Sequence, residues 1–302
     1  MLLKDFLKEG TARLESLYPT AEARNIVLML CEDRIGTKSY THLIEPGYTI
    51  KDKALGPLNE DMDRLASGEP VQYVLGSTEF CGLRFKVTPD VLIPRPETEL
   101  LCREAIKTGS RMQRMRKAYG DSYPVRILDL CTGSGCIAWT VALNIPGSVV
   151  VATDISEKAI MVAMEQDFQA SMKESGALAP QFIIADIFSD ENAFGLGQFD
   201  LILSNPPYIM DSQKEQMRPN VLNYEPHSAL FVPDDDPLLF YKAIARWSSS
   251  LLAPEGYGMT EINEQLGEST RKLFVDAGFH KSETVKDFYD KNRFIFYSRQ
   301  VL

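Results

Sequence analysis

The chain has 302 residues, of which 44% are hydrophobic and 25% are charged, so it is long enough for two domains and has the composition of a soluble globular enzyme. Its formal net charge of −10 argues against direct stable binding to duplex nucleic acid, because such binding needs a basic surface. The five cysteines are odd in number and form no Cys-x-x-Cys pair, which argues against disulfides and zinc knuckles and favours a reducing, cytoplasmic compartment.

The sequence predicts no signal peptide, no membrane span and no metal site. The first residues carry charges without the long apolar core of a signal peptide, and no apolar run approaches the roughly 18 residues of a membrane span. The three histidines are dispersed along the chain, so we expect no metal site.

Apolar residues recur at helical spacing from residue 2 to about residue 68, with breaks at Tyr18-Pro19, Gly36 and Glu45-Pro46-Gly47. This pattern predicts a small bundle of short helices in an N-terminal domain over residues 1–75. Its charges are of mixed sign, as on a solvated face, so packing and substrate recognition are expected rather than catalysis.

A β-hairpin and a helical linker are predicted over residues 76–124. Residues 80–88 alternate around Gly82 as a hairpin does, and residues 92–100 form a stiff loop that leads into a helix, with Pro96 suited to the first helical position. Arg95 lies between two prolines and therefore has a defined direction. It is either a structural arginine that binds nearby carbonyl groups or part of a site.

Residues 107–124 combine five basic side chains with little apolar periodicity. We predict the end of a helix followed by a solvated linker, with contact to an acidic partner as the alternative.

From residue 125 to residue 302, strand and helix patterns alternate. This predicts an α/β domain with a doubly wound, mostly parallel sheet of seven strands and helices on both faces. The strands are expected at residues 125–130, 149–153, 181–184, 201–204, 257–261, 283–287 and 293–298, the last two as an antiparallel pair. Ser156 is expected to cap a long helix that runs through Phe168.

The segment Asp129-Leu-Cys131-Thr132-Gly133-Ser134-Gly135 follows the first of these strands and begins a helix. Open α/β sheets bind their ligands at this place, and two glycines let the backbone approach a ligand closely. The loop also fits a Gly-x-Gly-x-x-Ala pattern, so by itself it does not separate a nucleotide cofactor from S-adenosylmethionine.

Acidic residues recur at the ends of the next two strands. Asp154 is placed to accept both hydroxyl protons of an adenosine ribose, and Ile155 adjoins it. Asp186 is placed to accept from an exocyclic amine while Ile187 packs on the adenine. This recurrence favours an adenosine site.

The tetrapeptide Asn205-Pro206-Pro207-Tyr208 follows the fourth strand. The side-chain oxygen of Asn205 and the carbonyl oxygen of Pro206 are two acceptors suited to the two N–H bonds of a planar –NH2 group, and Tyr208 offers a flat wall for it. A rigid turn is the alternative. A dehydrogenase does not need this motif, whereas a methyltransferase that acts on an –NH2 group does.

These motifs together resemble class I methyltransferases that alkylate amide or amino nitrogens. More closely, the chain from about residue 65 resembles the release factor glutamine methyltransferase family, also called HemK or PrmC. The segments that carry this closer resemblance are 70–73, 80–85, 92–100 and 224–230. The departures are a longer basic linker at residues 108–124 and additional residues at 191–197, and neither affects a motif position.

The resemblance implies an S-adenosylmethionine-dependent Rossmann-like fold, with S-adenosylhomocysteine as product and class 1 peptide chain release factors as partners. It implies methylation of the glutamine in a Gly-Gly-Gln motif at its amide nitrogen, N5. Asn205 and Pro206 would be catalytic, and Pro207, Tyr208 and Arg95 would bind substrate with them. The expected cofactor-binding residues are Asp129, Cys131, Thr132, Gly133, Ser134, Gly135, Asp154, Ile155, Asp186, Ile187 and Asn205.

Three other functions fit parts of the sequence. A glutamine methyltransferase of a ribosomal protein would share the tetrapeptide, as would an adenine or guanine amino methyltransferase, which the acidic composition disfavours. A protein that binds adenosine without catalysis would not need the intact tetrapeptide.

Overall fold

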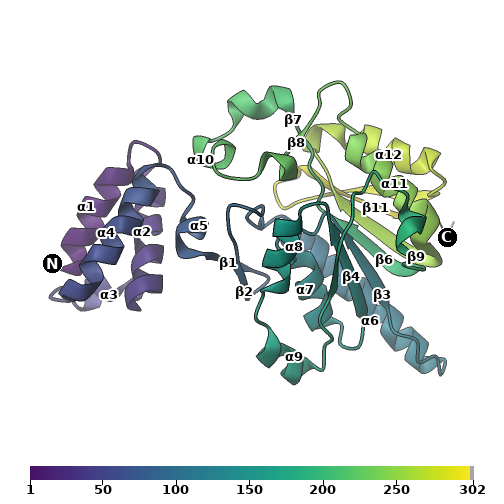
Figure 1. Cartoon of the computed structure of the whole chain (residues 1–302), viewed down its shortest axis with the longest axis horizontal. Helices are drawn as coiled ribbons and strands as arrows, with labels where there is room; N and C mark the ends of the chain where they lie inside the picture. Colours follow the sequence, from purple (N-terminus) through teal and green to yellow (C-terminus); the bar gives the residue numbers. More distant parts are fainter. Residues whose placement is uncertain (300–302) are drawn as a thin grey trace. The chain divides into compact units, whose positions relative to one another are not determined.

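The structure is a computed structural model that describes residues 1–299, apart from the side chain of Ala193. The chain divides into two compact units (Figure 1). One contains residues 1–77 and 217–224, and the other contains residues 78–216 and 225–302. Among the described residues, no helix is both long and apolar enough to cross a membrane.

The first unit is helical, as the N-terminal pattern predicts. Its helices are α1 (Leu3–Leu14), α2 (Thr20–Ile35), α3 (Thr41–Ile44), α4 (Asp52–Ala66), α5 (Val71–Leu75) and α10 (Pro219–Leu222). Leu7, Leu14, Leu30 and Met62 are among the side chains that form its buried core. Helix α2 ends at Gly36, whose φ of 70° is a left-handed conformation that glycine adopts without strain.

The segment 217–224 completes this unit although it comes late in the sequence. The hydroxyl of Tyr224 donates to the carbonyl oxygen of Ser67 at 2.9 Å, and Nη1 of Arg218 lies 2.7 Å from Oε1 of Glu22. The sequence pattern did not predict that this segment would pack with the N-terminal helices.

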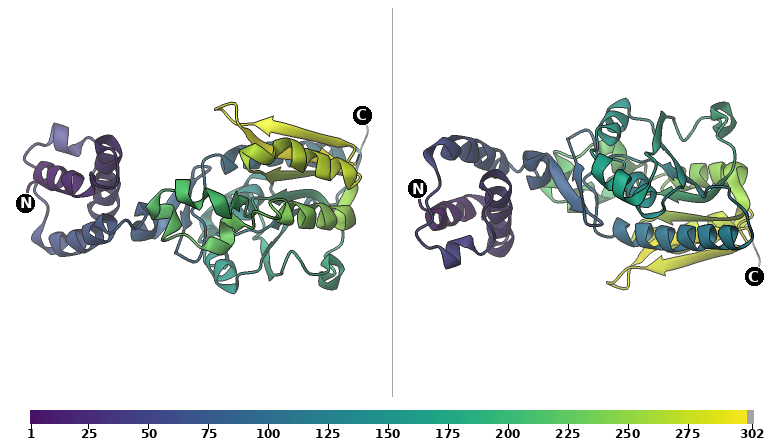
Figure 2. Two further views of the ribbon diagram at one scale, coloured as in Figure 1. Left: turned by 90° about the horizontal axis from the view of Figure 1, so that it is seen from above. Right: turned by 90° about the horizontal axis from the view of Figure 1, so that it is seen from below.

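The predicted hairpin, in which β1 (Ser77–Phe80) pairs with β2 (Leu83–Lys86), lies at the start of the second unit except for Ser77. The long helix α6 (Thr98–Ala118) follows and lies along the sheet, as the right-hand view of Figure 2 shows. The seven strands of the main sheet are β3 (Arg126–Leu130), β4 (Val149–Asp154), β5 (Gln181–Ile184), β6 (Phe199–Ser204), β9 (Leu252–Glu261), β10 (Lys281–Lys286) and β11 (Asn292–Ser298).

The helices of this unit between the strands are mostly short. They are α7 (Cys136–Asn144), α8 (Glu157–Met164), α9 (Gln169–Ser175), α11 (Leu239–Leu251) and α12 (Gly267–Asp276), with 3-10 turns η1 (Glu191–Phe194), η2 (Asp211–Gln216), η3 (His227–Ala229) and η4 (Glu264–Leu266). Two short strands, β7 (Ile209–Met210) and β8 (Phe231–Val232), form a separate parallel pair.

The strand order of the main sheet is β10-β11-β9-β6-β3-β4-β5. All pairs from β9 to β5 are parallel, and β11 pairs antiparallel with both β9 and β10. This confirms the predicted fold class. From β3 the chain adds β4 and β5 on one side and then β6 and β9 on the other, so the order reverses between β3 and β6, where such sheets bind ligands.

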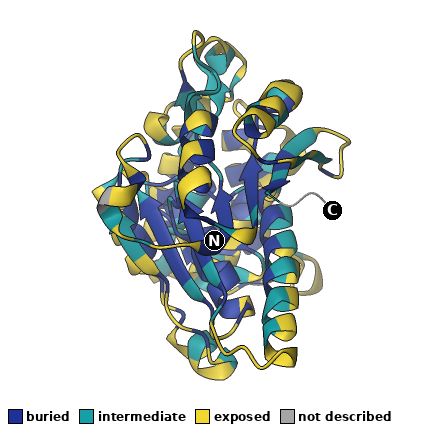
Figure 3. Cartoon of the chain, turned by 90° about the vertical axis from the view of Figure 1, so that its right-hand side faces the viewer, coloured by how far each residue is buried: buried dark blue, intermediate teal, exposed yellow. Residues whose placement is uncertain are grey.

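Both faces of the sheet are covered by helices. Side chains of α6 and α7, including Leu101 and Val141, pack with one face, and side chains of α11 and α12, including Trp247 and Phe274, pack with the other. Figure 3 shows the result, with buried strands inside and exposed residues on the outer surfaces of the helices. Each face thus has its own apolar core.

Three local predictions were wrong in detail. Helix α6 begins at Thr98, so Pro96 lies before the helix rather than at its first position, and the helix continues through the basic stretch to Ala118. Ser156 caps α8 as predicted, accepting from the N–H of Ala159 at 3.2 Å, but α8 ends at Met164. Phe168 directly precedes the separate helix α9 and is buried in the core.

Candidate active site

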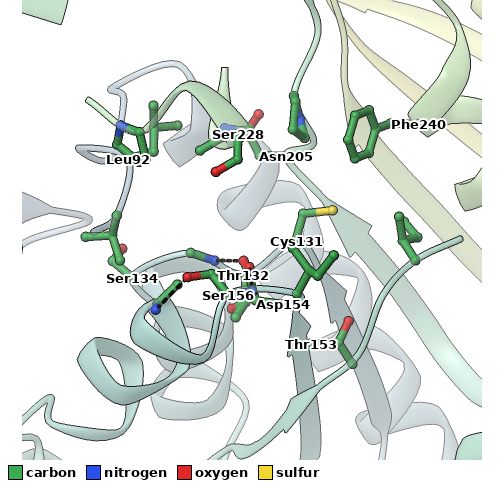
Figure 4. Close-up of a pocket in the computed structure, with 18 of the residues that line it drawn as sticks. Leu92, Cys131, Thr132, Ser134, Thr153, Asp154, Ser156, Asn205, Ser228 and Phe240 are labelled. Atoms are coloured by element: carbon green, nitrogen blue, oxygen red, sulfur yellow. Dashed lines mark hydrogen bonds between the residues drawn. The ribbon is translucent and has the colours of Figure 1, made fainter. Parts of the chain in front are cut away.

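A cavity of about 320 Å³ lies at the carboxyl ends of β3, β4 and β6. Its volume is within the range of about 300–1,000 Å³ that small-molecule sites occupy. In Figure 4, Leu92, Asn205 and Ser228 lie on one side of the cavity, and Ser134, Asp154 and Ser156 lie on the other. The cavity therefore opens at the reversal in strand order, between the loops that follow β3 and β6.

The pairing of the strands fixes the glycine-containing loop. Leu130 on β3 is the register partner of Ser204 on β6, and the hydroxyl of Ser204 donates to the carbonyl oxygen of Leu130 at 2.8 Å. Gly133 has a φ of 53° and Gly135 one of 77°, values that favour glycine. A Cβ atom at Gly135 would lie 3.0 Å from the Cβ of Ala163, so this glycine also allows close packing against α8.

Asp129 is fully buried beneath this loop. One of its carboxylate oxygens, Oδ2, accepts from the hydroxyl of Thr132 at 2.5 Å. The N–H of Ala138 also favours the ionised form, but no group among the described residues completes a hydrogen bond to Oδ1. Burial raises the pKa of Asp129 to about 7, because a charge in an apolar surrounding is poorly solvated. Asp129 thus supports the loop from below.

Asp154 holds the loop from the next strand. Its Oδ2 accepts from the N–H of Gly133 and its Oδ1 from the N–H of Ser156, each at 2.9 Å. Burial raises its pKa, while the two backbone donors favour the charged form. A carboxylate oxygen has a second lone pair, so both oxygens can still accept from hydroxyl groups in the cavity.

The loop after β5 contributes an apolar part of the wall. Ile187 lines the cavity, and Oδ1 of Asp186 accepts from the N–H of Phe188 at 2.8 Å. The side chain of Ile155, after β4, is 62% exposed although it is apolar, and it also lines the cavity. These apolar side chains suit the flat face of an aromatic ring.

Asn205 lies at the cavity in a defined orientation. Its side-chain nitrogen Nδ2 donates to Oγ1 of Thr98 at 3.1 Å, and the Thr98 hydroxyl donates to Oε2 of Glu261 at 2.7 Å. The hydroxyl of Tyr208 donates to Oε1 of the same Glu261 at 2.9 Å. The amide of Asn205 is therefore the end of a chain of hydrogen bonds that leads to a buried carboxylate.

Arg95 is part of an ion pair. Its Nη2 lies 2.6 Å from Oε1 of the buried Glu225, whose Oε2 accepts from the N–H of Ile93 at 3.1 Å. This pair ties the loop before α6 to the segment after residue 224. Both loops also line the cavity, through residues such as Leu92 and Ser228.

The structure brings together most, but not all, of the residues that the sequence singles out. The cavity wall includes Cys131, Thr132, Gly133, Ser134, Asp154, Ile155, Asp186, Ile187, Asn205 and Pro207. Asp129, Gly135, Arg95, Pro206 and Tyr208 do not line it. Of these, Asp129 and Tyr208 support residues of the wall through the hydrogen bonds described above.

Several wall residues were not singled out from the sequence. They are Asp90, Val91, Leu92, Pro94, Thr98, Cys136, Ile137, Thr153, Ser156, Ala159, Ala185, Phe188, Phe240 and the segment containing Pro226, Ser228, Ala229 and Phe231. Thr98 and the residues around Pro226 belong to motifs used for the resemblance, which is a signal that could have identified them. Phe240, on α11, had no local signal.

The comparisons with known proteins agree with this architecture. Residues 5–76 match the family model described as PrmC N-terminal domain, and residues 100–223 match the one described as methyltransferase small domain. The release factor glutamine methyltransferase of Bacteroides thetaiotaomicron is 34% identical over 282 residues, which cover 93% of this chain and 95% of that protein. The protein of the same name from Flavobacterium psychrophilum is 35% identical over 98% of both chains.

Among solved structures, the hMettl16 catalytic domain in complex with MAT2A 3′UTR hairpin 6 has a TM-score of 0.53. The match covers 85% of this chain and 86% of that one at 13% identity, so it shows a similar fold and nothing about function. With two relatives above 30% identity over nearly their whole length, the chain belongs to the release factor glutamine methyltransferase family, whose members are S-adenosylmethionine-dependent methyltransferases.

Proposed function

We propose that this chain transfers the methyl group of S-adenosylmethionine to the amide nitrogen N5 of the glutamine in the Gly-Gly-Gln motif of class 1 peptide chain release factors. The observation that carries the proposal is the orientation of Asn205. Its Nδ2 donates to Thr98, so its Oδ1 is the atom left to accept from an incoming –NH2 group.

The chemistry explains why such an acceptor is needed. An amide nitrogen is a poor nucleophile, because its lone pair is delocalised into the carbonyl group. Accepting both N–H bonds, at Oδ1 of Asn205 and the carbonyl oxygen of Pro206, would orient the nitrogen and favour the charge that develops on it. As the bond between this nitrogen and the methyl carbon forms, the bond between that carbon and sulfur would break and S-adenosylhomocysteine would leave with the electron pair. The nitrogen would lose one of its protons to solvent.

The cofactor fits the cavity residues. S-adenosylmethionine supplies an electrophilic methyl group on a sulfonium ion. Asp154 would bind the ribose hydroxyls through its remaining lone pairs, beside Ile155, and Asp186 and Ile187 would hold the adenine. The loop from Cys131 to Gly135, supported by Asp129, would follow the rest of the cofactor.

The substrate side would be formed by the tetrapeptide from Asn205 to Tyr208. Pro207 lines the cavity, and Tyr208 is fixed through its hydroxyl on Glu261. Arg95 would contribute by holding the loop before α6 in place through Glu225, rather than through a free guanidinium group. We propose that the N-terminal unit contacts the release factor outside the Gly-Gly-Gln loop.

Mass spectrometry tests the activity. A purified class 1 release factor, incubated with the enzyme and S-adenosylmethionine, should gain one methyl group on the glutamine of its Gly-Gly-Gln motif. The Asn205→Ala variant should lose turnover by about 10²-fold or more while it still binds S-adenosylhomocysteine. Asn144→Ala, an exposed asparagine on α7 outside the cavity wall, is the matched control and should methylate normally.

The same assay distinguishes the other acceptors. Methylation of a ribosomal protein, or of adenine or guanine in nucleic acid, with no methylation of the release factor, would replace the proposed substrate. No transfer to any of these acceptors would contradict the proposal as a whole.

A further inference from the structure

We propose that Thr98 and Glu261 are positioning residues that determine which atom of the Asn205 amide faces the methyl acceptor. This inference rests on the proposed role of Asn205 as an acceptor of N–H bonds. Thr98 lines the cavity beside Asn205, Glu261 does not, and both are inferred to act through the Asn205 amide.

Three elements bring these residues together. Thr98 is the first residue of α6, Asn205 directly follows β6, and Glu261 is the last residue of β9. Strands β6 and β9 are parallel, and Ser204 is the register partner of Thr260. The next residue on each strand, Asn205 and Glu261, therefore emerges at the same edge of the sheet.

The direction of the hydrogen bonds follows from counting protons. Burial raises the pKa of Glu261, and the hydrogen bonds from Thr98 and Tyr208 oppose this by favouring its ionised form. An ionised carboxylate only accepts, so ionised Glu261 takes the single proton of the Thr98 hydroxyl at 2.7 Å. Only lone pairs of Thr98 Oγ1 are then left for Asn205, 3.1 Å away. Asn205 must turn its –NH2 toward Thr98, and its Oδ1 is forced to the opposite side.

Burial makes this arrangement strict. Thr98 and Glu261 are each 1% exposed, so water does not offer a replacement partner. The other oxygen of Glu261 is occupied by the hydroxyl of Tyr208 at 2.9 Å. A buried polar group without its partner is disfavoured strongly enough to favour one amide orientation over the other by about tenfold or more.

Substitution of Glu261 by glutamine should exchange the donor and acceptor roles in the hydrogen bonds that connect residue 261, Thr98 and Asn205. In Glu261→Gln, the Gln oxygen can still accept from Tyr208, and the Gln –NH2 then faces Thr98 and donates to it. The Thr98 hydroxyl is released to donate to Oδ1 of Asn205, which turns the –NH2 of Asn205 toward the acceptor. The –NH2 group of Asn205, a hydrogen-bond donor, would then face the substrate nitrogen, which needs an oxygen to accept its N–H bond.

Kinetics and cofactor binding test this. For Glu261→Gln and Thr98→Val we expect kcat for release factor methylation to fall about 10- to 100-fold, with KM for the factor and the affinity for S-adenosylhomocysteine within about threefold of wild type. Thr98→Ser keeps the hydroxyl and should restore kcat to within about threefold. A kcat near that of wild type in both Glu261→Gln and Thr98→Val would overturn the inference.

A measurement without substrate separates this inference from the proposed function. In protein labelled with ¹⁵N-asparagine, the Nδ2 protons of Asn205 should show nuclear Overhauser contacts to the side chain of residue 98 in wild type and Thr98→Ser, and lose them in Glu261→Gln. Absence of these contacts in wild type, or their persistence in Glu261→Gln, contradicts the inference. If wild type methylates no release factor but the contacts change as expected, the proposed substrate fails and the positioning roles stand.

Discussion

Arg116 and Asp200 form a two-armed ion pair between the end of α6 and the start of β6. Nη2 of Arg116 lies 2.5 Å from Oδ1 of Asp200, and Nη1 lies 3.0 Å from Oδ2. The N–H of Arg126 donates to the same carboxylate at 2.8 Å, so one acidic side chain joins a helix to two strands.

Removing the arginine should destabilise the fold. In Arg116→Met, Asp200 keeps the Arg126 N–H but loses its charged partner, and we expect the free energy of unfolding to fall by about 1–3 kcal/mol. Urea denaturation measures this. Arg114→Met, at an exposed position on the same helix, is the control and should change stability by less than about 0.5 kcal/mol. Equal effects of the two variants would argue against a structural role for the pair.

The buried Asp129 should make stability depend on pH. Its pKa is raised from 3.8 to about 7 in the folded protein, so between these values the folded state binds more protons than the unfolded state. The free energy of unfolding therefore decreases as pH rises through this range, by an amount on the order of a few kcal/mol for this residue.

Asp129→Asn has no such titration. Denaturation of both proteins from pH 4.5 to pH 8 should show wild type losing stability relative to the variant as pH rises. A difference in unfolding free energy that stays constant over this range would show that Asp129 does not titrate there.

The pair of Arg95 and Glu225 should affect cofactor binding indirectly. In Glu225→Ala, both the guanidinium of Arg95 and the N–H of Ile93 lose their acceptor, so the loop before α6 is released. Because Leu92 and Pro94 line the cavity, we expect weaker binding of S-adenosylhomocysteine, by about tenfold, in isothermal titration calorimetry.

A double-mutant cycle with Arg95→Met tests whether the two residues act through each other. Coupling energies of residues in direct contact are about 0.5–3 kcal/mol, and purely additive losses would contradict the proposed loop anchor.

The N-terminal unit carries exposed apolar side chains on α3. Leu43 is 68% exposed and Ile44 is 66% exposed, which marks a candidate contact for the release factor. Replacing both with serine should raise KM for the intact factor several-fold and leave KM for a short peptide with the Gly-Gly-Gln motif unchanged. A steady-state methyl transfer assay with both substrates measures this, and equal changes for the two would count against recognition by α3.

The sheet was predictable because its strands are short apolar runs bounded by turn residues, and their number, order of appearance and type agree with the structure. The basic stretch after residue 107 was not, because charge and weak apolar periodicity suggest a linker. Arg, Lys, Met and Gln are nevertheless good helix formers, and Arg116 gains a partner 84 residues away. That partner cannot be read from local sequence.

The candidate site also contains residues that the sequence identifies and residues that only the fold brings together. The residues around Gly133 and Asn205 are close together in short motifs, so the sequence identifies them. Thr98 and Glu261 are 163 residues apart, and only the pairing of β6 with β9 and the start of α6 make them neighbours. Thr98 belongs to a motif of the resemblance, but that motif does not give its role, and Glu261 belongs to none. The role inferred for both residues follows from the direction of their hydrogen bonds.

The return of residues 217–224 to the helical unit has a consequence for protein engineering. A gene cut after codon 77 would not yield two self-sufficient products, because the shorter one would lack α10 and the longer one would keep it without Ser67 and Glu22 to bind. Exchange of the helical unit between family members would therefore require two crossover points in the second half of the gene in addition to one in the first.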